Sequence, residues 1–574
     1  MLTARHPPGS YTLIQRPLWR PHPTIADRAA WQSLPDSVRD AYVSSAARSL
    51  DAPWDILPAS RYLDFARDGN RSRFQELYFQ RRQKFTGLVA AECIENEGRF
   101  LDEIVNGLWL VAEETSWCVP AHIGMQKAGV GLPDDTEPLV DLFAAETGAM
   151  LAWTAYLLEK RLDAVSPLVL PRLSREVSRR ILVPCRARED FWWMGLRGNA
   201  VNNWNPWIVS NWLACTLLIE DDESLRAAAV AKAVRCLDAF VGPYPADGGC
   251  DEGPGYWTRA GASLYDCLEL LYSATNGRFD EYSDPLVRNI GRFIYRVHIA
   301  GPYVVNFADA PAMSVPPAAL VFGYGRRIGD ADMERHGAWA ARETDLWRRR
   351  PSDKPITPRI SSLGRLLEEL ARLPDLEAAD PRPPLPRDVW LDVIQVMVAR
   401  DRAGSEAGFF LAAKGGHNAE SHNHNDVGHF IVYLDGRPLL IDAGVETYTR
   451  KTFSAERYDI WTMQSAFHNL PAVDGVQQAP GREFAARDAR HAADDASATL
   501  DLDIAAAYPA AAKLRSWRRR LTLLRGRHVE LTDAYEREAA PSRVAMNLLT
   551  PCEADLSQAG RVVLRETALA DGRR

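Results

Sequence analysis

Histidines gather in one short segment of the chain, residues 420–429. His422, His424 and His429 are three of only twelve histidines in the sequence, and they lie within eight residues of one another. Packing does not require such a concentration, and histidine is both a common metal ligand and the side chain that titrates near neutral pH. We therefore expect this segment to take part in catalysis or metal binding. An exposed polar loop is the alternative.

A carboxylate follows at a spacing that suits a metal site. Residues 430–441 read as a β-hairpin, which would bring Asp442 opposite residue 429. His429 or His424 could then share a site with Asp442, and His468 is a candidate third ligand. Two histidines and one carboxylate around one ion are an ordinary zinc arrangement.

A second polar segment, residues 197–207, holds four asparagines and two tryptophans. Asn202 and Asn203 offer neutral hydrogen bonds, and Trp204 offers a flat apolar face for a sugar ring. Together these side chains suit a carbohydrate cleft. The alternative is a capped helix start with its tryptophans in the core.

A glycine-rich loop, residues 247–255, leads to Tyr256 at a helix entrance. A tyrosine held in this way can act as an acid or a base if a cation lowers its pKa, although a lone tyrosine is more often structural. The same loop carries Asp251 and Glu252. These two carboxylates could instead serve a glycoside hydrolase.

Helices must position both segments, because the sequence reads as helical from about residue 38 to 372. Apolar residues repeat at i, i+3, i+4 and i+7 in 101–112 and 230–241, as in amphipathic helices. A closed toroid, a bundle and a solenoid all fit this pattern. Further helices are predicted at 70–93, 136–162, 168–186, 206–219, 257–276, 284–299 and 329–347.

The pattern changes after a proline-rich, charged stretch. Residues 376–387 are predicted to be a linker between a helical domain, 1–375, and a sheet domain, 388–574. An antiparallel sandwich or barrel is expected there. The chain stops soon after 561–565, so the sheet domain is expected to lack its last strands or to be naturally short. Strands are predicted in 389–398 and 408–413, and hairpins over 430–441 and over 518–524 with 528–532.

Composition and charge exclude several classes of protein. The chain has 574 residues, of which 46% are hydrophobic and 25% charged, as in soluble globular proteins of more than one domain. The net charge of −8 argues against nucleic acid and anionic membranes as partners. The sequence has no run of about 18 uncharged apolar residues, so no membrane span is predicted. The first residues lack the pattern of a secretory signal, which predicts a cytoplasmic rather than a periplasmic protein.

Taken together, the motifs resemble those of the heparinase II/III-like polysaccharide lyases. They occur in the expected order over about residues 190–475. The resemblance implies an incomplete (α/α) toroid followed by an antiparallel β-sandwich, with the active site in the cleft between them. It rests on Asn202-Asn203-Trp204, the 247–256 loop, His422-Asn-His424-Asn-Asp426, the segment ending at Asp442-Ala-Gly, and His468-Asn469 followed by Val473-Asp-Gly475.

The resemblance also implies a division of labour among the histidines. His422 would face the substrate. His424, Asp442 and His468 would hold a zinc ion that is largely structural and fixes the loop of the catalytic histidine. His429 is then left over as a strand residue.

The implied reaction is β-elimination in an acidic glycan that contains 4-O-linked hexuronic acid. Asn202 or Asn203 would hydrogen-bond the uronate carboxylate and stabilise the developing negative charge. His422 or Tyr256 would remove the C5 proton, and Tyr256 would protonate the leaving oxygen. The substrate-binding candidates are Arg197, Trp204, Glu252 and Arg259.

Several alternatives stay open at this point. Some alginate-acting relatives have a histidine near Asn202 and Asn203, which is absent here, so alginate specificity is not carried over. An imported oligosaccharide cut from its end is the favoured substrate for a cytoplasmic enzyme. A hydrolase using Asp251 and Glu252, or a non-catalytic carbohydrate-binding protein, are the rival functions. The oligomeric state is open, with a homodimer as one option.

Overall fold

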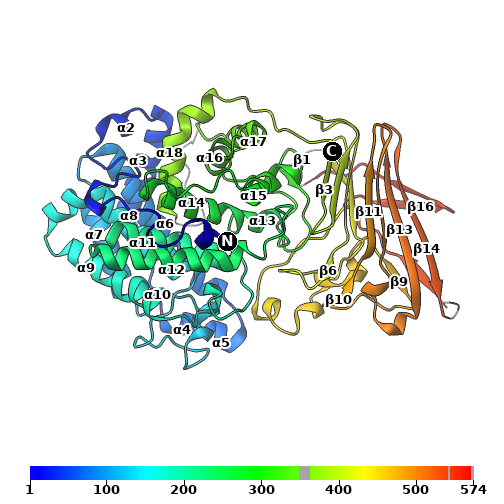
Figure 1. Cartoon of the computed structure of the whole chain (residues 1–574), viewed down its shortest axis with the longest axis horizontal. Helices are drawn as coiled ribbons and strands as arrows, with labels where there is room; N and C mark the ends of the chain where they lie inside the picture. The colour runs from blue at the N-terminus through cyan, green and yellow to red at the C-terminus, as the bar shows by residue number, and fades with distance from the viewer. Residues whose placement is uncertain (348–361, 539, 541–542, 570–574) are drawn as a thin grey trace.

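The computed structural model describes residues 1–347, 362–538, 540 and 543–569. Helices fill the first part of the chain and antiparallel strands the second (Figure 1). The predicted fold class, an incomplete (α/α) toroid followed by an antiparallel β-sandwich, is confirmed. In the described part of the chain, no helix combines the length and the apolar content needed to cross a bilayer.

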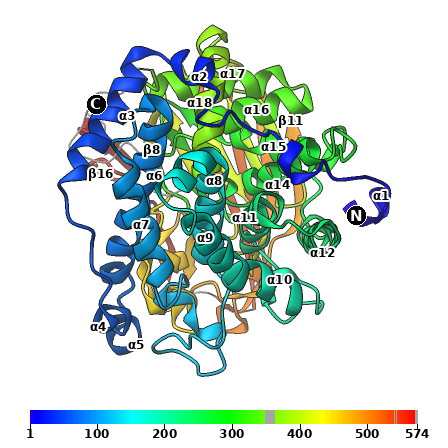
Figure 2. The ribbon, with the colours of Figure 1, turned by 90° about the vertical axis from the view of Figure 1, so that its left-hand side faces the viewer.

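The long helices of the first part close into a ring, which Figure 2 shows from one end. Each of the five helices named at the end of this paragraph packs against the next, and the last packs against the first. The first two, over residues 142–165 and 204–219, are buried along most of their length, as expected for helices that are apolar on nearly every side. The ring consists of α8 (Leu142–Val165), α11 (Trp204–Ile219), α14 (Gly261–Ala274), α16 (Ala318–Ile328) and α18 (Leu363–Ala378).

Further helices pack around these members. Two of them, over residues 72–95 and 101–113, match the stretches predicted at 70–93 and 101–112 closely. These further helices are α3 (Asp36–Leu50), α6 (Ser72–Glu95), α7 (Leu101–Glu113), α9 (Val169–Val177), α10 (Val183–Ala187), α12 (Glu223–Val241), α15 (Pro285–Arg296) and α17 (Ala331–Glu343).

Aspartate side chains define where several helices begin. Asp141 accepts a hydrogen bond from the Ala144 amide, so α8 starts at residue 142 and not at 136 as predicted. Asp222, Asp284 and Asp330 cap α12, α15 and α17 in the same way.

Two further differences from the predicted boundaries lie near prolines. The helix predicted at 168–186 contains a π turn at Ser178–Leu182, which ends two residues before Pro184, and Pro184 has no amide hydrogen to donate. In contrast, α18 continues through Pro374 to Ala378. The first three residues of the predicted linker, 376–378, are therefore helical.

The second part of the chain is built on two antiparallel sheets. One has five strands in the order β3-β4-β5-β7-β8, and the other has four in the order β11-β12-β13-β14. The predicted hairpins over 430–441 and 518–532 are present as β7–β8 and β13–β14. The strands are β3 (Asp388–Leu391), β4 (Val396–Arg400), β5 (Phe409–Lys414), β7 (Phe430–Leu434), β8 (Arg437–Leu440), β11 (Arg487–Ala493), β12 (Ser497–Asp503), β13 (Leu514–Leu524) and β14 (His528–Arg537).

The five-stranded sheet buries both of its faces. Met397 and Leu411 point into the core shared with the four-stranded sheet. Their neighbours Val398 and Phe410 point the other way, into the core of the helical part. The molecule therefore has three layers, helices, sheet and sheet, and β4 and β5 read as continuous apolar runs because water reaches neither face.

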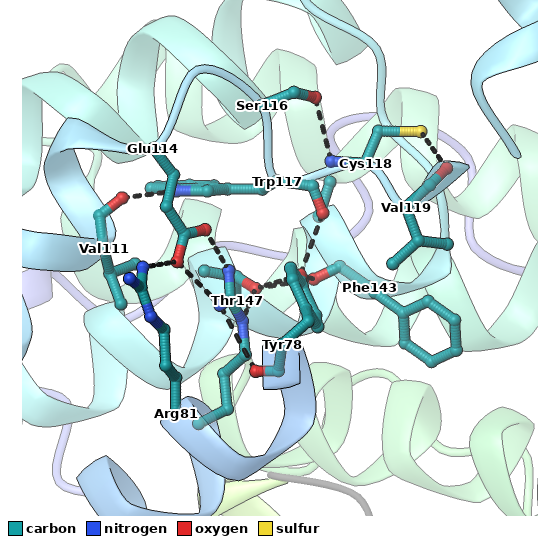
Figure 3. A network of polar contacts seen from close by, with 12 residues as sticks. Tyr78, Arg81, Val111, Glu114, Ser116, Trp117, Cys118, Val119, Phe143 and Thr147 are labelled. Atoms are coloured by element: carbon teal, nitrogen blue, oxygen red, sulfur yellow. Dashed lines mark hydrogen bonds and ion pairs between the residues drawn. The ribbon is translucent and has the colours of Figure 1, made fainter. Parts of the chain in front are cut away.

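A buried polar network fixes α6 and α7 to the loop that follows them (Figure 3). Glu114 receives ion pairs from Arg81 at 3.0 Å and from Arg82 at 2.5 Å. The Tyr78 hydroxyl lies 2.8 Å from the carbonyl oxygen of Trp117, to which it donates, and the Arg82 guanidinium lies over the Tyr78 ring at 3.4 Å. Each charge in this network has a partner, as burial requires.

Candidate active site

The candidate catalytic residues of the helical part and of the sheet part meet where the helical ring faces the five-stranded sheet. The side-chain amide of Asn203 donates to Glu252, and Glu252 Oε2 lies 3.3 Å from His422 Nε2. The Tyr256 and His422 rings lie 4.1 Å apart between centroids. Segments separated by more than 200 residues thus form one cluster, which we call the central cluster: Asn203, Glu252, Tyr256 and His422.

The glycine-rich loop packs so tightly that a side chain would not fit at one position. Gly253 has a φ of +87°, and a Cβ built on it would lie 2.6 Å from the carbonyl oxygen of Phe307 and 2.9 Å from the Ala310 side chain. Glycine is the residue that accepts both this backbone conformation and this close approach. The packing holds Tyr256 against residues 306–311.

His422 itself has a strained backbone. Its φ of +56° places it in the left-handed region, which non-glycine residues seldom adopt. The ring is held on both sides, by Glu252 at Nε2 and by Asp309 at 2.7 Å from Nδ1. The side chain is therefore fixed toward Tyr256 at a cost in local backbone energy.

Asp309 is a residue of the site that sequence reasoning missed. It is almost fully buried and accepts hydrogen bonds from four side chains: His422, His424, Arg457 and Tyr448. Burial alone would raise the pKa of Asp309, but the histidine hydrogen bonds and the Arg457 charge hold it well below its usual range. The residues next to Asp309 in the sequence include no histidine and no glycine. An aspartate inside an apolar run was therefore the one feature of the sequence that could have indicated a functional role for it.

Tyr448 was also missed. Its hydroxyl lies 2.7 Å from the Tyr256 hydroxyl and 2.9 Å from the Asp309 carboxylate. Burial raises the pKa of both tyrosines above the ordinary value, so both phenols are protonated at neutral pH. Tyr448 lies in a segment of irregular structure before a short 3-10 helix, where no periodicity marks a functional residue.

Glu252 differs from the other carboxylates of the cluster. Burial raises its pKa to about 7, with a further upward contribution from Asp251 and a downward one from His422. Glu252 can therefore exist in either protonation state near neutral pH. Asp251 has another task, because its carboxylate accepts the Ser421 amide at 3.0 Å and so holds the backbone of the histidine loop.

His424, Asp442 and His468 form a buried group that could hold a metal ion. His424 Nδ1 lies 3.3 Å from His468 Nε2, which in turn lies 3.6 Å from Asp442 Oδ2. Ligands bound at about 2.1 Å around a tetrahedral ion lie roughly 3.4 Å apart, so the spacing fits.

The second ring nitrogen of each histidine supports this assignment. His468 Nδ1 lies 2.9 Å from the carbonyl oxygen of Gln464, and His424 Nε2 lies 3.0 Å from the Asp309 carboxylate. Both acceptors require a hydrogen on the nitrogen that faces them. In neutral rings, the two nitrogens that face one another then carry lone pairs, which is the usual state of metal-binding histidines.

His429 is not a plain strand residue, since β7 begins one position later, at Phe430. Its Nε2 lies 3.1 Å from Asp442 Oδ2, although the pair is not aligned for a hydrogen bond. Its Nδ1 accepts the Asn469 amide at 2.9 Å, so the hydrogen of the neutral ring is on Nε2. His424 and His429, the two histidines predicted to lie near Asp442, both do so. Of the two, only a neutral His424 directs a nitrogen lone pair into the metal-binding group.

The remaining candidates lie farther from the central cluster. Trp204 contacts His122 and Trp192, with ring centroids 4.5 and 5.0 Å away, and all three rings are half-buried. The Asn202 side chain accepts the Trp204 amide and so belongs to the start of α11. A partly exposed aromatic surface thus lies beside Asn203.

The two arginines proposed from the sequence lie in different places. Arg197 is exposed and lines a surface groove formed by α9, α10 and the loops before α8 and α11. Arg259 lies inside the helical ring, 3.4 Å from Glu146 and over the Trp207 ring at 4.2 Å. Burial lowers the pKa of Arg259 to about 10.

Comparison with known proteins agrees with this architecture. Residues 383–570 match the family described as heparinase II/III-like, C-terminal. None of the curated proteins matches the sequence.

Among solved structures, a crystal structure of heparinase III is similar over 95% of this chain and 77% of its own, with 13% identity and a TM-score of 0.59. A second heparinase III matches over 94% and 76%, with 12% identity and a TM-score of 0.58. Heparan sulfate lyase from Pedobacter heparinus matches over 90% and 74%, with 13% identity and a TM-score of 0.51. These likenesses concern the fold. Residues 383–570 thus match the heparinase II/III-like family, and the family resemblance indicated by the sequence motifs is confirmed.

Proposed function

We propose that the protein is a polysaccharide lyase that cleaves a uronate-containing glycan by β-elimination. The observation that carries the proposal is the central cluster, in which an amide and carboxyl pair, an imidazole and a phenol meet between the two halves. β-Elimination needs these three functions: a group that neutralises the uronate carboxylate, a base for the C5 proton and an acid for the leaving oxygen.

Asn203 and Glu252 are suited to bind the uronate carboxylate. The Asn203 side-chain amide can donate a hydrogen bond, and a protonated Glu252 can donate a second one because its pKa is raised to about 7. Two donors on the carboxylate stabilise the negative charge that develops there when C5 loses its proton. Asn202 remains a further candidate for this role.

His422 is the better base and Tyr256 the better acid. The Nδ1 hydrogen of His422 is directed at Asp309, so a neutral ring has its lone pair on Nε2, toward Glu252. Nε2 takes the C5 proton while the C4–O4 bond breaks, a C4–C5 double bond forms, and Tyr256 gives its hydroxyl hydrogen to O4. The Tyr448 hydroxyl, 2.7 Å from the Tyr256 hydroxyl, helps to hold this acid in position. Tyr256 as the base is the alternative for the other C5 epimer.

His424, Asp442 and His468 would hold a zinc ion. Bound there, zinc would supply positive charge and a cross-link between the histidine loop and the segment before β9 (Pro471–Val473). Because His424 is two residues from His422, the same three ligands would keep the catalytic loop in place. This role is structural.

The favoured substrate class is a glycosaminoglycan. The similar structures are named as heparinase III and heparan sulfate lyase, and the aromatic surface at Trp204 is suited to stack on a sugar ring. Arg197 and Arg259 are kept as candidates for binding acidic groups. Acidic glycan is the one partner that we propose.

The test is to incubate the protein with heparan sulfate, chondroitin sulfate and alginate oligosaccharides and to follow two signals. Elimination raises the ultraviolet absorbance, because the new double bond is conjugated with the carboxylate, and Tyr256→Phe should abolish the rise. Reducing ends without absorbance would indicate hydrolysis by Asp251 and Glu252. Binding without either signal would indicate a non-catalytic protein, and product sizes would distinguish cleavage at chain ends from internal cleavage.

A further inference from the structure

Asp309 touches both the metal-binding group and the central cluster. Its Oδ2 lies 2.7 Å from His422 Nδ1, and its Oδ1 lies 3.0 Å from His424 Nε2. We infer that Asp309 is a positioning residue that couples the metal group to the catalytic histidine. The part of the inference that concerns catalysis rests on the proposed lyase function, whereas the part that concerns metal binding does not.

Each oxygen of the Asp309 carboxylate serves two donors. Oδ1 receives Arg457 at 2.8 Å together with His424, and Oδ2 receives the Tyr448 hydroxyl at 2.9 Å together with His422. Arg457 cannot turn away, because its other nitrogens donate to the carbonyl oxygens of Asn423 and Thr452. The carboxylate is therefore held in one orientation.

This arrangement determines which nitrogen of each histidine is free. A carboxylate can only accept, so both ring nitrogens that face it carry hydrogen. The lone pair of His424 is then on Nδ1, toward His468, and the lone pair of His422 is on Nε2, toward Glu252. One side chain thus prepares one histidine to bind a cation and the other to accept a proton.

The position of Asp309 in the fold also fits this role. It comes from the helical half, between β2 (Tyr303–Val304) and α16, and reaches histidines of the sheet half. The preceding Ala308 has a φ of +60°, an uncommon conformation for alanine that turns the chain at this point. Asp309 is 3% exposed, so water does not replace it as the acceptor.

The two histidines respond differently to an amide at this position. In Asp309→Asn the amide oxygen must face Arg457, which can only donate, so His424 keeps its acceptor. The NH2 group then faces His422 Nδ1, which can accept from it only if the ring hydrogen moves to Nε2. The base is lost while the metal ligand is retained. Asp309→Ala removes both acceptors.

The experiment combines kinetics, metal content and NMR of the full chain. For Asp309→Asn we expect kcat to fall by roughly 10²–10⁴-fold, the size seen when a carboxylate that orients a catalytic histidine is lost, with KM changed little and zinc content unchanged. For Asp309→Ala we expect zinc affinity, measured by competition with a chelator, to fall by about 10–100-fold as well. In 15N spectra, the His422 ring nitrogens should exchange their protonated and unprotonated shifts in Asp309→Asn.

Glu406→Gln is the matched control. Glu406 is another carboxylate at the contact between the two halves: it accepts the Gly301 amide at 3.0 Å and lies outside the segments of the central cluster. It should leave kcat, zinc affinity and the His422 spectrum unchanged, with a similar melting temperature in all variants.

The inference is overturned if Asp309→Asn keeps its kcat and its His422 tautomer, or if Asp309→Ala binds zinc as tightly as the wild type. A wild type that forms no unsaturated product would contradict the proposed function instead. The zinc and NMR measurements would still decide the role of Asp309 in that case.

Discussion

Glu252 is a buried carboxyl group whose ionisation is displaced into the neutral pH range. Its pKa is raised from 4.5 in an ordinary setting to about 7, first of all by burial. The folded state therefore binds this proton more tightly than the unfolded state does. The corresponding stability is fully present below pH 4.5 and is lost as the pH rises through about 7.

A measurement of stability against pH tests this assignment. Glu252→Gln, which cannot ionise, should not lose this stability, so its free energy of unfolding relative to wild type should rise between pH 4.5 and 7, by up to about 3 kcal/mol. Denaturant unfolding at several pH values provides the comparison. A difference that stays constant over this range would show that Glu252 is ionised throughout.

The sequence indicated the reactive side chains better than it indicated the residues that orient them. Histidines and glycines stand out by type and spacing, so His422, His424 and the Tyr256 loop could be found. Asp309 and Tyr448 are common residues in segments without a regular period, and their importance comes from contacts across the fold. His429 lies one residue before β7, and its proximity to Asp442 likewise comes from a contact across the fold.

At the scale of loops and helices, the close approach at Gly253 links packing to catalysis. An alanine there would bring its Cβ within 2.6 Å of the Phe307 carbonyl oxygen, so the loop must move and Tyr256 with it. We expect Gly253→Ala to lower kcat by about 10²-fold, since small displacements of reacting groups have effects of this size. Gly404→Ala is the control: φ is +68° there too, but a Cβ meets nothing within 4 Å. Equal activities of the two variants would refute this link.

The network around Glu114 makes a prediction about stability alone. Glu114→Gln removes the charge that two buried guanidinium groups share, those of Arg81 and Arg82. Breaking a buried ion pair typically costs about 3–5 kcal/mol, so the thermal midpoint should fall clearly. Asp36→Asn, in the exposed pair with Arg39, should change stability by less than about 1 kcal/mol. Similar midpoints for the two variants would show that the Glu114 charge is not needed.

Helix and strand types were predicted well because burial enforces their period, while boundaries depended on local contacts. The cap at Asp141 shortened one helix, and α18 passed through Pro374 because that helix packs against α8 and α16 along the ring. Periodicity could not show that the helices form a toroid. That prediction came from the family resemblance, and the structure confirmed it.

At the scale of the whole molecule, the groove at Arg197 suggests how a long acidic chain would be held. Among the described residues, five basic side chains line it beside three acidic ones, in a protein with a net charge of −8: Lys127, Arg175, Arg179, Arg188 and Arg197, with Glu137, Glu189 and Asp190.

The double variant Arg175→Glu with Arg197→Glu should raise KM for a polymer several-fold and weaken its dependence on salt, because screened attraction is lost. It should leave turnover of a short oligosaccharide unchanged. Arg382→Glu with Arg561→Glu makes the same change in net charge at other exposed positions and serves as the control. An equal effect on short and long substrates would contradict a role for the groove.

The five-stranded sheet, buried on both faces, has a consequence for how the chain is made. The helical part leaves the ribosome first, and the apolar surface that later receives Val398 and Phe410 is then still bare. Until β3 to β8 have been synthesised, that surface is open to other chains and to chaperones. A fragment that ends before residue 388 should therefore aggregate during expression, whereas co-expression with the missing sheet region should rescue it.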